Sequence, residues 1–199
     1  MGLKRIAVFI SGGGTNLQSL IRHIHGKYGS IELVISSNPK AYGLKRAEEN
    51  KIENLYINPN RDEEILERLR EKEIDFIVLA GYLQKISSPL VTAYRGKIIN
   101  IHPSLIPSFC GPDYYGIKVH QKAIEYGVKI SGATVHFVDE GMDTGPIIMQ
   151  EAVEVYPEDK PEDLQNRVLD VEHKILSESV KKMCQDKLIL NGRIVKVIE

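Results

Sequence analysis

Short apolar runs alternate with longer amphipathic segments through the first half of the chain. Four of these runs predict β-strands, over residues 5–10, 31–36, 55–57 and 75–80. Between them, apolar residues recur at helical spacing and predict helices over residues 16–25, 42–50 and 62–72. Strands separated by helices favour right-handed βαβ units, and therefore a doubly wound α/β sheet.

In the second half of the chain, strands and helices no longer alternate regularly. Strands are predicted over 97–102 and 132–138, and helices over 117–126 and 161–186. The last segments, 188–190 and 193–198, predict a hairpin with Asn191 and Gly192 in a type I′ turn. Because no repeat or linker separates the halves, we expect one domain over residues 1–199. It would be a Rossmann-like α/β fold with a mostly parallel sheet, helices on both faces, and a mononucleotide-binding half up to about residue 100.

The composition narrows the class of protein. Of 199 residues, 42% are hydrophobic and 27% are charged, as in globular proteins. With 26 basic and 27 acidic residues, nothing indicates a nucleic-acid or membrane-surface partner. No apolar run approaches the roughly 18 residues of a membrane helix, and the start is too briefly apolar for a signal peptide. Cys110 and Cys184 form no close-spaced pattern, so we expect a reducing compartment and a cytoplasmic protein.

A glycine turn at residues 11–14 stands between the first strand and the first helix. A helix that begins there offers free N–H groups and its positive end to an anion. Leu17 replaces the third glycine of a dinucleotide motif, and no P-loop lysine follows. The pattern therefore predicts a site for one terminal phosphate, with the Thr15 hydroxyl and the Asn16 amide as further donors. The alternative is a tight turn with a helix cap.

Two polar side chains mark the end of the strand over 97–102. Asn100 and His102 are two residues apart and so share one face of that strand. An amide beside an imidazole can polarise a carbonyl group and stabilise the oxyanion that forms from it. The alternative is a histidine that only makes structural hydrogen bonds.

A third candidate lies in the acidic loop after the strand over 132–138. Asp143, between Met142 and a Thr-Gly-Pro turn, is expected to be less solvated than Asp139 and Glu140. Such a carboxyl group would have a raised pKa and shuttle protons; the alternative is a solvated turn in which Asp143 binds its own backbone. The histidines at 23, 25 and 120 lack ligand spacing, so no metal site is expected.

Three motifs resemble, in order, those of the phosphoribosylglycinamide formyltransferases: SGGGTNL at 11–17, NIHPSLIP at 100–107 and HFVDEGMDTGPI at 136–147. The resemblance extends from about residue 5 to the final hairpin. It implies a folate-dependent enzyme of de novo purine biosynthesis. In that reaction the amine of glycinamide ribonucleotide takes the formyl group of 10-formyltetrahydrofolate, which gives formylglycinamide ribonucleotide and tetrahydrofolate.

The resemblance also implies roles for individual residues. Asn100 and His102 would stabilise the oxyanion, while Asp143 would orient His102 and manage proton transfer. His136 and Ser104 would support this trio.

The substrate contacts are implied in the same way. Gly14, Thr15 and Asn16 would bind the ribonucleotide phosphate, and Glu172 the glycinamide end. The folate, a cosubstrate in an enzyme without a metal, would contact Arg61, Leu83, Gln84, Lys85, Ile86, Asn100, Val138, Asp139, Glu140, Gly141, Met142 and Asp143. The segment 108–116 is longer than the usual version in the family, and Lys85 stands where an apolar residue is usual.

Three other functions compete with this interpretation. An enzyme of the same fold could formylate a different phosphorylated or sugar amine, and the glycine turn favours a phosphorylated one. A hydrolase would deformylate the folate without any amine. A sensing module that binds a nucleotide or folate would not need the proton-transfer set. The expected partners are small-molecule substrates, and the expected state is a monomer or homodimer.

Overall fold

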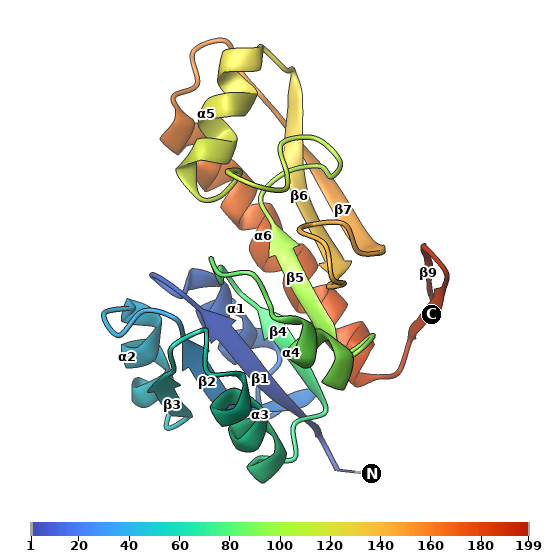
Figure 1. Cartoon of the computed structure of the whole chain (residues 1–199). Coiled ribbons are helices and arrows are strands. Elements are labelled where there is room, and N and C mark those ends of the chain that lie inside the picture. The colour runs from blue at the N-terminus through green and yellow to red at the C-terminus, as the bar shows by residue number, and fades with distance from the viewer. Residues whose placement is uncertain (1, 199) are drawn as a thin grey trace.

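The computed structural model describes residues 2–198, and its centre is a β-sheet of seven strands (Figure 1). The strands are β1 (Lys4–Ile10), β2 (Gly29–Ser36), β3 (Glu53–Tyr56), β4 (Phe76–Leu79), β5 (Ile98–His102), β6 (Ile130–Phe137) and β7 (Ile147–Glu154). Their order across the sheet is β3-β2-β1-β4-β5-β6-β7. The strands from β1 to β5 pair in parallel, whereas β6 runs antiparallel to both β5 and β7.

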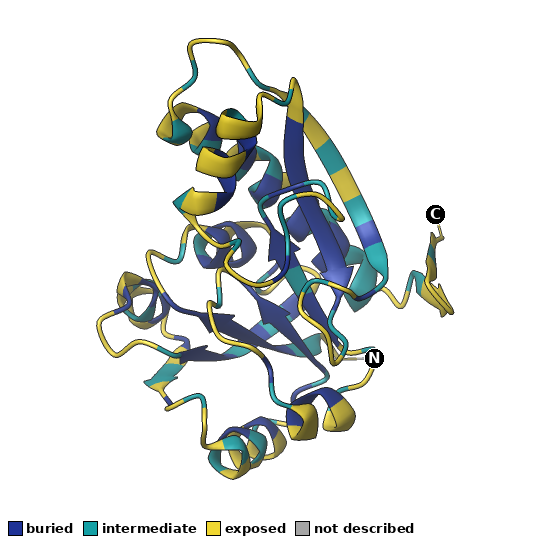
Figure 2. Cartoon of the chain, turned by 45° about the horizontal axis from the view of Figure 1, so that its top comes forward, coloured by how far each residue is buried: buried dark blue, intermediate teal, exposed yellow. Residues whose placement is uncertain are grey.

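Helices cover both faces of this sheet. They are α1 (Thr15–His23), α2 (Tyr42–Glu49), α3 (Asp62–Glu71), α4 (Ser88–Ala93), α5 (Ile117–Tyr126) and α6 (Pro161–Cys184). Buried residues of α1, α2, α5 and α6 pack into the core on one face, and those of α3 and α4 pack on the other. The sheet is accordingly buried along most of its length, with the exposed positions on the outer sides of the helices (Figure 2). The mostly parallel, Rossmann-like α/β fold predicted from the sequence is confirmed.

The apolar patterns explain these layers. All four residues of β4 are buried, as expected of a central parallel strand that is covered on both faces. In α1, Leu17, Leu20 and Ile21 recur at helical spacing and form the buried stripe. The sheet therefore forms from runs that are apolar on both faces, and the helices from runs that are apolar on one.

The strand order places a ligand crevice at a defined point. After β3 the chain crosses to the other side of β1, so that β1 and β4 are neighbours whose carboxyl ends meet. There the N–H of Ser11 donates to the carbonyl of Gly81 at 3.1 Å, and the Ser11 hydroxyl accepts from the N–H of Leu83 at 2.8 Å. Open α/β sheets bind ligands at such a switch point.

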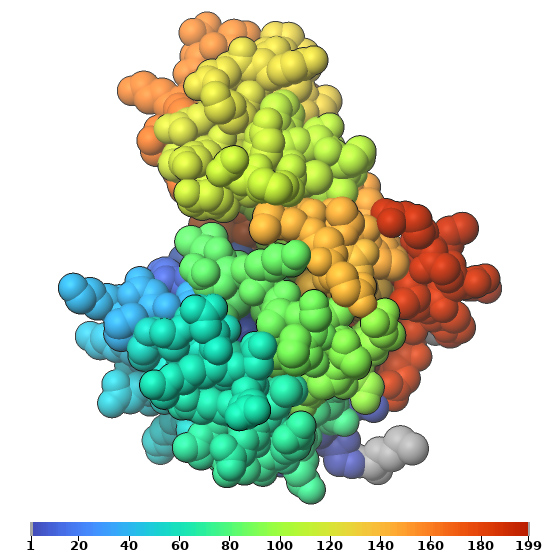
Figure 3. Space-filling view, in the orientation of Figure 1, coloured from blue at the N-terminus to red at the C-terminus, as the bar shows by residue number. Residues whose placement is uncertain are grey.

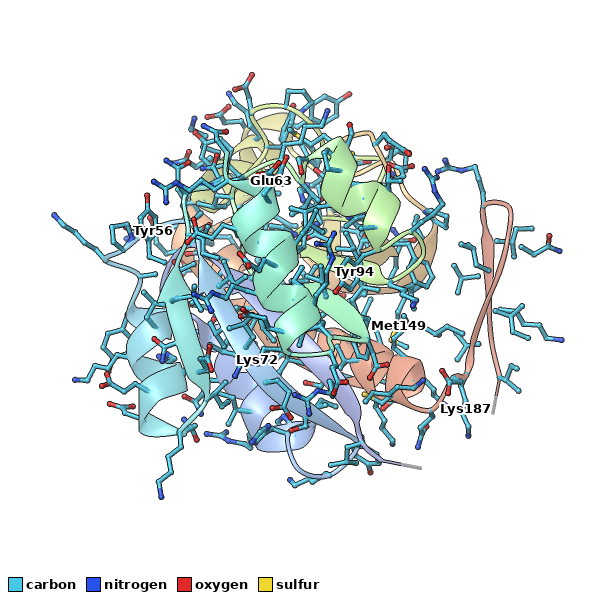
Figure 4. The ribbon with its side chains drawn as sticks, turned by 60° about the horizontal axis from the view of Figure 1, so that its bottom comes forward. Tyr56, Glu63, Lys72, Tyr94, Met149 and Lys187 are labelled. Carbon is cyan, nitrogen blue, oxygen red and sulfur yellow. The ribbon has the colours of Figure 1, made fainter. Side chains whose placement is uncertain are left out.

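Two elements and one turn differ from the sequence predictions. The short helix α4 and the edge strand β7 were not predicted. The terminal hairpin of β8 (Leu188–Asn191) and β9 (Ile194–Val197) is present and stands out from the body beyond Lys187 (Figure 4). The prediction of a type I′ turn was wrong. Asn191 pairs with Ile194, so Gly192 and Arg193 are the central residues of the turn. A type I′ turn requires a positive φ at both central residues, and here only Gly192 has one.

Candidate functional site

The glycine turn is held tightly against the start of α2. Gly14 has φ 72°, and a Cβ atom there would lie 2.6 Å from the Cα atom of Gly43. The N–H of Gly43 donates to the carbonyl of Gly12 at 3.0 Å. No side chain caps α1, so the N–H groups of its first turn have no partner from a capping residue. The turn therefore presents backbone donors and the positive end of a helix at the crevice.

Asn16 and Glu172 form a buried pair beneath this turn. The Nδ2 atom of Asn16 donates to Oε2 of Glu172 at 2.7 Å, which ties α1 to α6. Burial raises the pKa of Glu172 to about 7, and the hydrogen bond from Asn16 opposes that rise. The Oδ1 atom of Asn16 is buried and has no hydrogen-bond partner. The amide nitrogen predicted to serve a phosphate is thus already engaged by Glu172.

Asn100 is oriented by His136 across the β5–β6 pair. The two residues are register partners, and Nδ2 of Asn100 lies 3.1 Å from Nε2 of His136. The Nδ1 atom of His136 lies 2.7 Å from the carbonyl oxygen of Phe137, which can only accept, so Nδ1 carries the hydrogen. In neutral His136 the Nε2 atom is then an acceptor, and Asn100 donates to it; in the charged ring Nε2 carries a hydrogen and faces Oδ1 of Asp143, 3.6 Å away. This leaves the second amide hydrogen of Asn100 for a ligand.

His102 and Asp143 lie side by side at the end of β5. His102 is 5% exposed, and its Nδ1 atom lies 3.5 Å from Oδ2 of Asp143. Its Nε2 atom donates to the carbonyl of Phe109 at 2.9 Å. Burial lowers the pKa of His102, against the opposing effects of the Asp143 charge and the Phe109 carbonyl. His102 is therefore mainly neutral at pH 7.

The pKa of Asp143 is lowered, whereas the sequence analysis predicted a raised one. Burial alone would raise its pKa, but the contact with His136, the charge of His102 and the N–H of Gly111 together lower it. The Gly111 N–H lies 2.9 Å from Oδ2. The raised pKa predicted for Asp143 was therefore wrong, because these three partners stabilise the carboxylate more than burial disfavours it.

A cavity of about 680 Å³ brings most of the predicted site residues together. In the space-filling view, residues near 80–86, 110–116 and 140 meet around a hollow (Figure 3). Its lining includes the following predicted residues: Thr15, Leu83, Gln84, Lys85, Ile86, Asn100, His102, His136, Val138, Asp139, Gly141, Met142, Asp143 and Glu172.

The remaining predicted residues do not line this cavity. Gly14 and Asn16 support it from the turn and from behind Glu172. Ser104 is fully buried, and its hydroxyl donates to the carbonyl of Ser108 at 2.6 Å. Arg61 pairs with Glu64 at 3.1 Å before α3, and Glu140 pairs with Arg95 at 2.6 Å.

The structure adds lining residues to which the sequence analysis assigned no role in the site. They are Leu79, Gly81, Tyr82, Ile101, Pro103, the loop residues 111–116, His120, Gln165, Asn166 and Leu169. One signal was available, because Gln165, Leu169 and Glu172 share a helical face at spacings of four and three residues. His120 is 1% exposed, its Nδ1 atom has no partner, and burial together with the charge of His102 lowers its pKa to about 4.

Residues 2–198 lack two further kinds of feature. These residues include no cluster of three or more His, Cys, Asp or Glu side chains placed to hold a metal ion. Among their helices, none combines the length and apolar character that crossing a membrane requires.

Comparison with known proteins identifies the family. Residues 4–180 match the formyl transferase family. The phosphoribosylglycinamide formyltransferase of Bacillus subtilis is 40% identical over 96% of this chain and 98% of its own length. The chloroplastic one of Vigna unguiculata is 39% identical over 98% of this chain, which spans about two thirds (66%) of that longer relative.

A solved structure agrees with these relatives. Glycinamide ribonucleotide transformylase 1 from Symbiobacterium toebii superimposes with a TM-score of 0.92 at 39% identity, covering 99% of this chain and 95% of its own. The predicted resemblance is therefore confirmed over nearly the whole chain. Together with the arrangement of Asn100, His102 and Asp143 around one cavity, these matches show that the chain belongs to the phosphoribosylglycinamide formyltransferase family, enzymes of purine biosynthesis.

Proposed function

We propose that this enzyme transfers the formyl group of 10-formyltetrahydrofolate to the amine of glycinamide ribonucleotide. The observation that carries the proposal is the convergence of Asn100, His102 and Asp143 in one cavity. The lining of that cavity also includes Thr15, beside the anion-binding turn, and the segment 83–86. A phosphorylated amine and a donor with a flat ring system would thus meet at Asn100, His102 and Asp143.

The ribonucleotide would bind at the end of the cavity near α1. Its phosphate would accept from the backbone N–H groups of the first turn and from the Thr15 hydroxyl. Glu172 would accept from the glycinamide end, while the unpartnered Oδ1 of Asn16 provides a further acceptor nearby. This assignment is supported by Gly14, whose left-handed φ and close approach to Gly43 leave no room for a side chain.

The folate would bind between the segments 83–86 and 138–143, which contribute the apolar side chains of Leu83, Ile86, Val138 and Met142 to the cavity. Ile86 is buried, Leu83 and Met142 are exposed at the cavity, and the partly buried Val138 packs against the core. A planar pterin suits such a slot, with backbone groups of the two segments available as hydrogen-bond partners. Because Arg61 and Glu140 are already paired with other side chains, we do not assign them to this site.

The geometry supports one route for the proton. As the amine attacks the formyl carbon, the free amide hydrogen of Asn100 would donate to the developing oxyanion, a contribution typically worth about 3–4 kcal/mol of barrier. The Nε2 hydrogen of His102 is engaged by Phe109, so His102 would instead accept the amine proton at Nδ1, next to Asp143. The new C–N bond forms, the bond to the folate nitrogen breaks, and that nitrogen receives the proton.

An absorbance assay with a 10-formyl folate, with and without glycinamide ribonucleotide, tests the proposal. We expect deformylated folate to appear only when the amine is present. Release without the amine would indicate a hydrolase, and release with another phosphorylated amine would indicate a different transferase. Absence of release in every case would reject a formyl-transfer function for this cavity.

Three broader properties remain proposals. We expect the whole chain to act as one domain, because α6 contacts α1 as well as β5, β6 and β7. We expect a monomer or homodimer, which sedimentation would decide. The free thiols Cys110 and Cys184 support a cytoplasmic location.

A further inference from the structure

The loop between β5 and α5 contacts both members of the His102–Asp143 pair. The carbonyl of Phe109 accepts the hydrogen of His102 Nε2 at 2.9 Å. Two residues later, the N–H of Gly111 donates to Oδ2 of Asp143, also at 2.9 Å. His102 ends β5, whereas Asp143 lies in the loop after β6, so the segment 109–111 is a partner that the two side chains share.

The backbone of this segment is strained. Phe109 has φ 49° and Gly111 has φ 84°, both in the left-handed region. For a residue with a Cβ atom this conformation costs roughly 1–2 kcal/mol. Such strain persists only where surrounding contacts hold it, and it concentrates at functional sites.

Aromatic contacts hold Phe109 in this conformation. Its ring packs edge-to-face against Tyr114 and against Tyr126 at the end of α5, with centroid distances of 6.1 Å in both cases. It also packs against the core under α5. On the other side, the buried Ser104 hydroxyl holds the carbonyl of Ser108. The carbonyl of Phe109 is thereby aimed at His102.

The orientation of the Phe109 carbonyl determines which nitrogen of His102 exchanges a proton. A carbonyl oxygen can only accept, so Nε2 of His102 carries a hydrogen in both the neutral and the charged ring. The proton that comes and goes is therefore the one on Nδ1, next to Asp143. Without the Phe109 carbonyl, the neutral ring would prefer to keep its hydrogen on Nδ1 and donate it to the Asp143 carboxylate. The lone pair would then lie on Nε2, on the side away from Asp143.

We propose that Phe109 is a positioning residue, whose aromatic contacts hold its carbonyl on His102 and so make Nδ1 the atom that exchanges the proton. The effect on turnover rests on the proposed function, but the choice of nitrogen does not. The other titratable groups that face His102 are Asp143, His136 and His120.

Nitrogen-15 NMR of labelled histidine tests the choice of nitrogen without any substrate. The two ring nitrogens of His102 are assigned by their absence from a His102→Gln spectrum. At pH 8 we expect the Nε2–H form in the native enzyme, a shift toward Nδ1–H in Phe109→Ala, and restoration in Phe109→Tyr. A native spectrum that shows the Nδ1–H form would overturn the proposal.

Kinetics test the consequence for turnover. We expect Phe109→Ala to lower kcat roughly ten- to a hundredfold, with KM for both substrates within about twofold. The limb of the kcat–pH profile that reports His102 should move to lower pH, because the Phe109 carbonyl raises the pKa of His102. Unchanged kcat and an unchanged tautomer in Phe109→Ala would overturn the proposal.

Two further variants provide a second test of the aromatic contact and a control. Tyr126 is 81% exposed and outside the cavity, so Tyr126→Ala tests the same aromatic contact in a chain that folds, even if Phe109→Ala does not. We expect a severalfold fall in kcat, and native kcat with a native tautomer would count against the proposal. Tyr28→Ala, an exposed ring that contacts Lys181, is the control with no expected effect. If the native chain is inactive with glycinamide ribonucleotide, the proposed function is rejected. The proposal for Phe109 is then still decided by the NMR experiment.

Discussion

Replacing Glu172 by Gln should stabilise the protein at alkaline pH while leaving it unchanged in acid. Glu172 is 8% exposed, and burial raises its pKa from 4.5 to about 7. The unfolded chain ionises this carboxyl group near pH 4.5, whereas the folded chain keeps it protonated up to about pH 7. Between these values the unfolded state binds fewer protons, so the free energy of unfolding falls as the pH rises.

The size of the effect follows from the two pKa values. Each pH unit between 4.5 and about 7 removes about 1.4 kcal/mol, so the total loss is about 3 kcal/mol. The stability is fully present below pH 4.5 and lost as the pH rises through about 7. A glutamine keeps an acceptor for Nδ2 of Asn16, and its own amide can donate to the unpartnered Oδ1 of Asn16. At pH 8 the variant should therefore be up to about 3 kcal/mol more stable, or about 6–12 °C in Tm.

Urea unfolding of both proteins from pH 4.5 to 8 measures this difference. Glu178→Gln is the matched control, because Glu178 is on the same helix but half-exposed and paired with lysines. The control should show little change in stability with pH. A difference between Glu172→Gln and the native protein that stays constant from pH 4.5 to 8 would refute the reasoning.

Four other substitutions have defined expected outcomes. Asn100→Ala and His102→Ala should each lower kcat by about a hundred- to a thousandfold, with an unchanged circular dichroism spectrum; near-native turnover would remove that residue from the mechanism. Gly14→Ala should cost about 1–2 kcal/mol in thermal unfolding and raise KM for the ribonucleotide, because the residue has a left-handed φ and meets Gly43. Gly12→Ala, where a Cβ atom would meet nothing within 4 Å, is its control. Arg61→Ala should leave KM for the folate unchanged, since Arg61 pairs with Glu64; a severalfold rise would return Arg61 to the folate site.

The spacing of apolar residues predicted the strands and helices whose side chains are well buried. The all-buried β4 and the striped α1 could be recognised because packing on one or both faces dictates their apolar positions. The edge strand β7 was missed because it has one neighbouring strand, and only one of its eight residues is fully buried. The helix α4 was missed because six residues are too few for a helical period, although its proline near the N-terminus was a usable signal.

The grouping of the candidate residues was predictable from the sequence, but their electrostatics were not. Residues two apart on one strand, such as Asn100 and His102, could be placed on the same face from spacing alone. The lowered pKa of Asp143 depends on Gly111, His136 and His102, which come from other parts of the chain, and no spacing shows that they meet. The same limit applies to Phe109, because a left-handed phenylalanine has no signature in sequence.

The antiparallel pairing of β5 with β6 decides which changes in chain length the enzyme can tolerate. Asn100 faces His136, and His102 faces Thr134, while Ile101 and Val135 point into the core between them. Deleting one residue inside β6 would exchange these two sets and bury His136 among apolar side chains. A deletion in the exposed turn after Tyr126 would leave the register intact. Insertions and deletions should therefore survive in the turns around this strand pair and be lethal to activity within it.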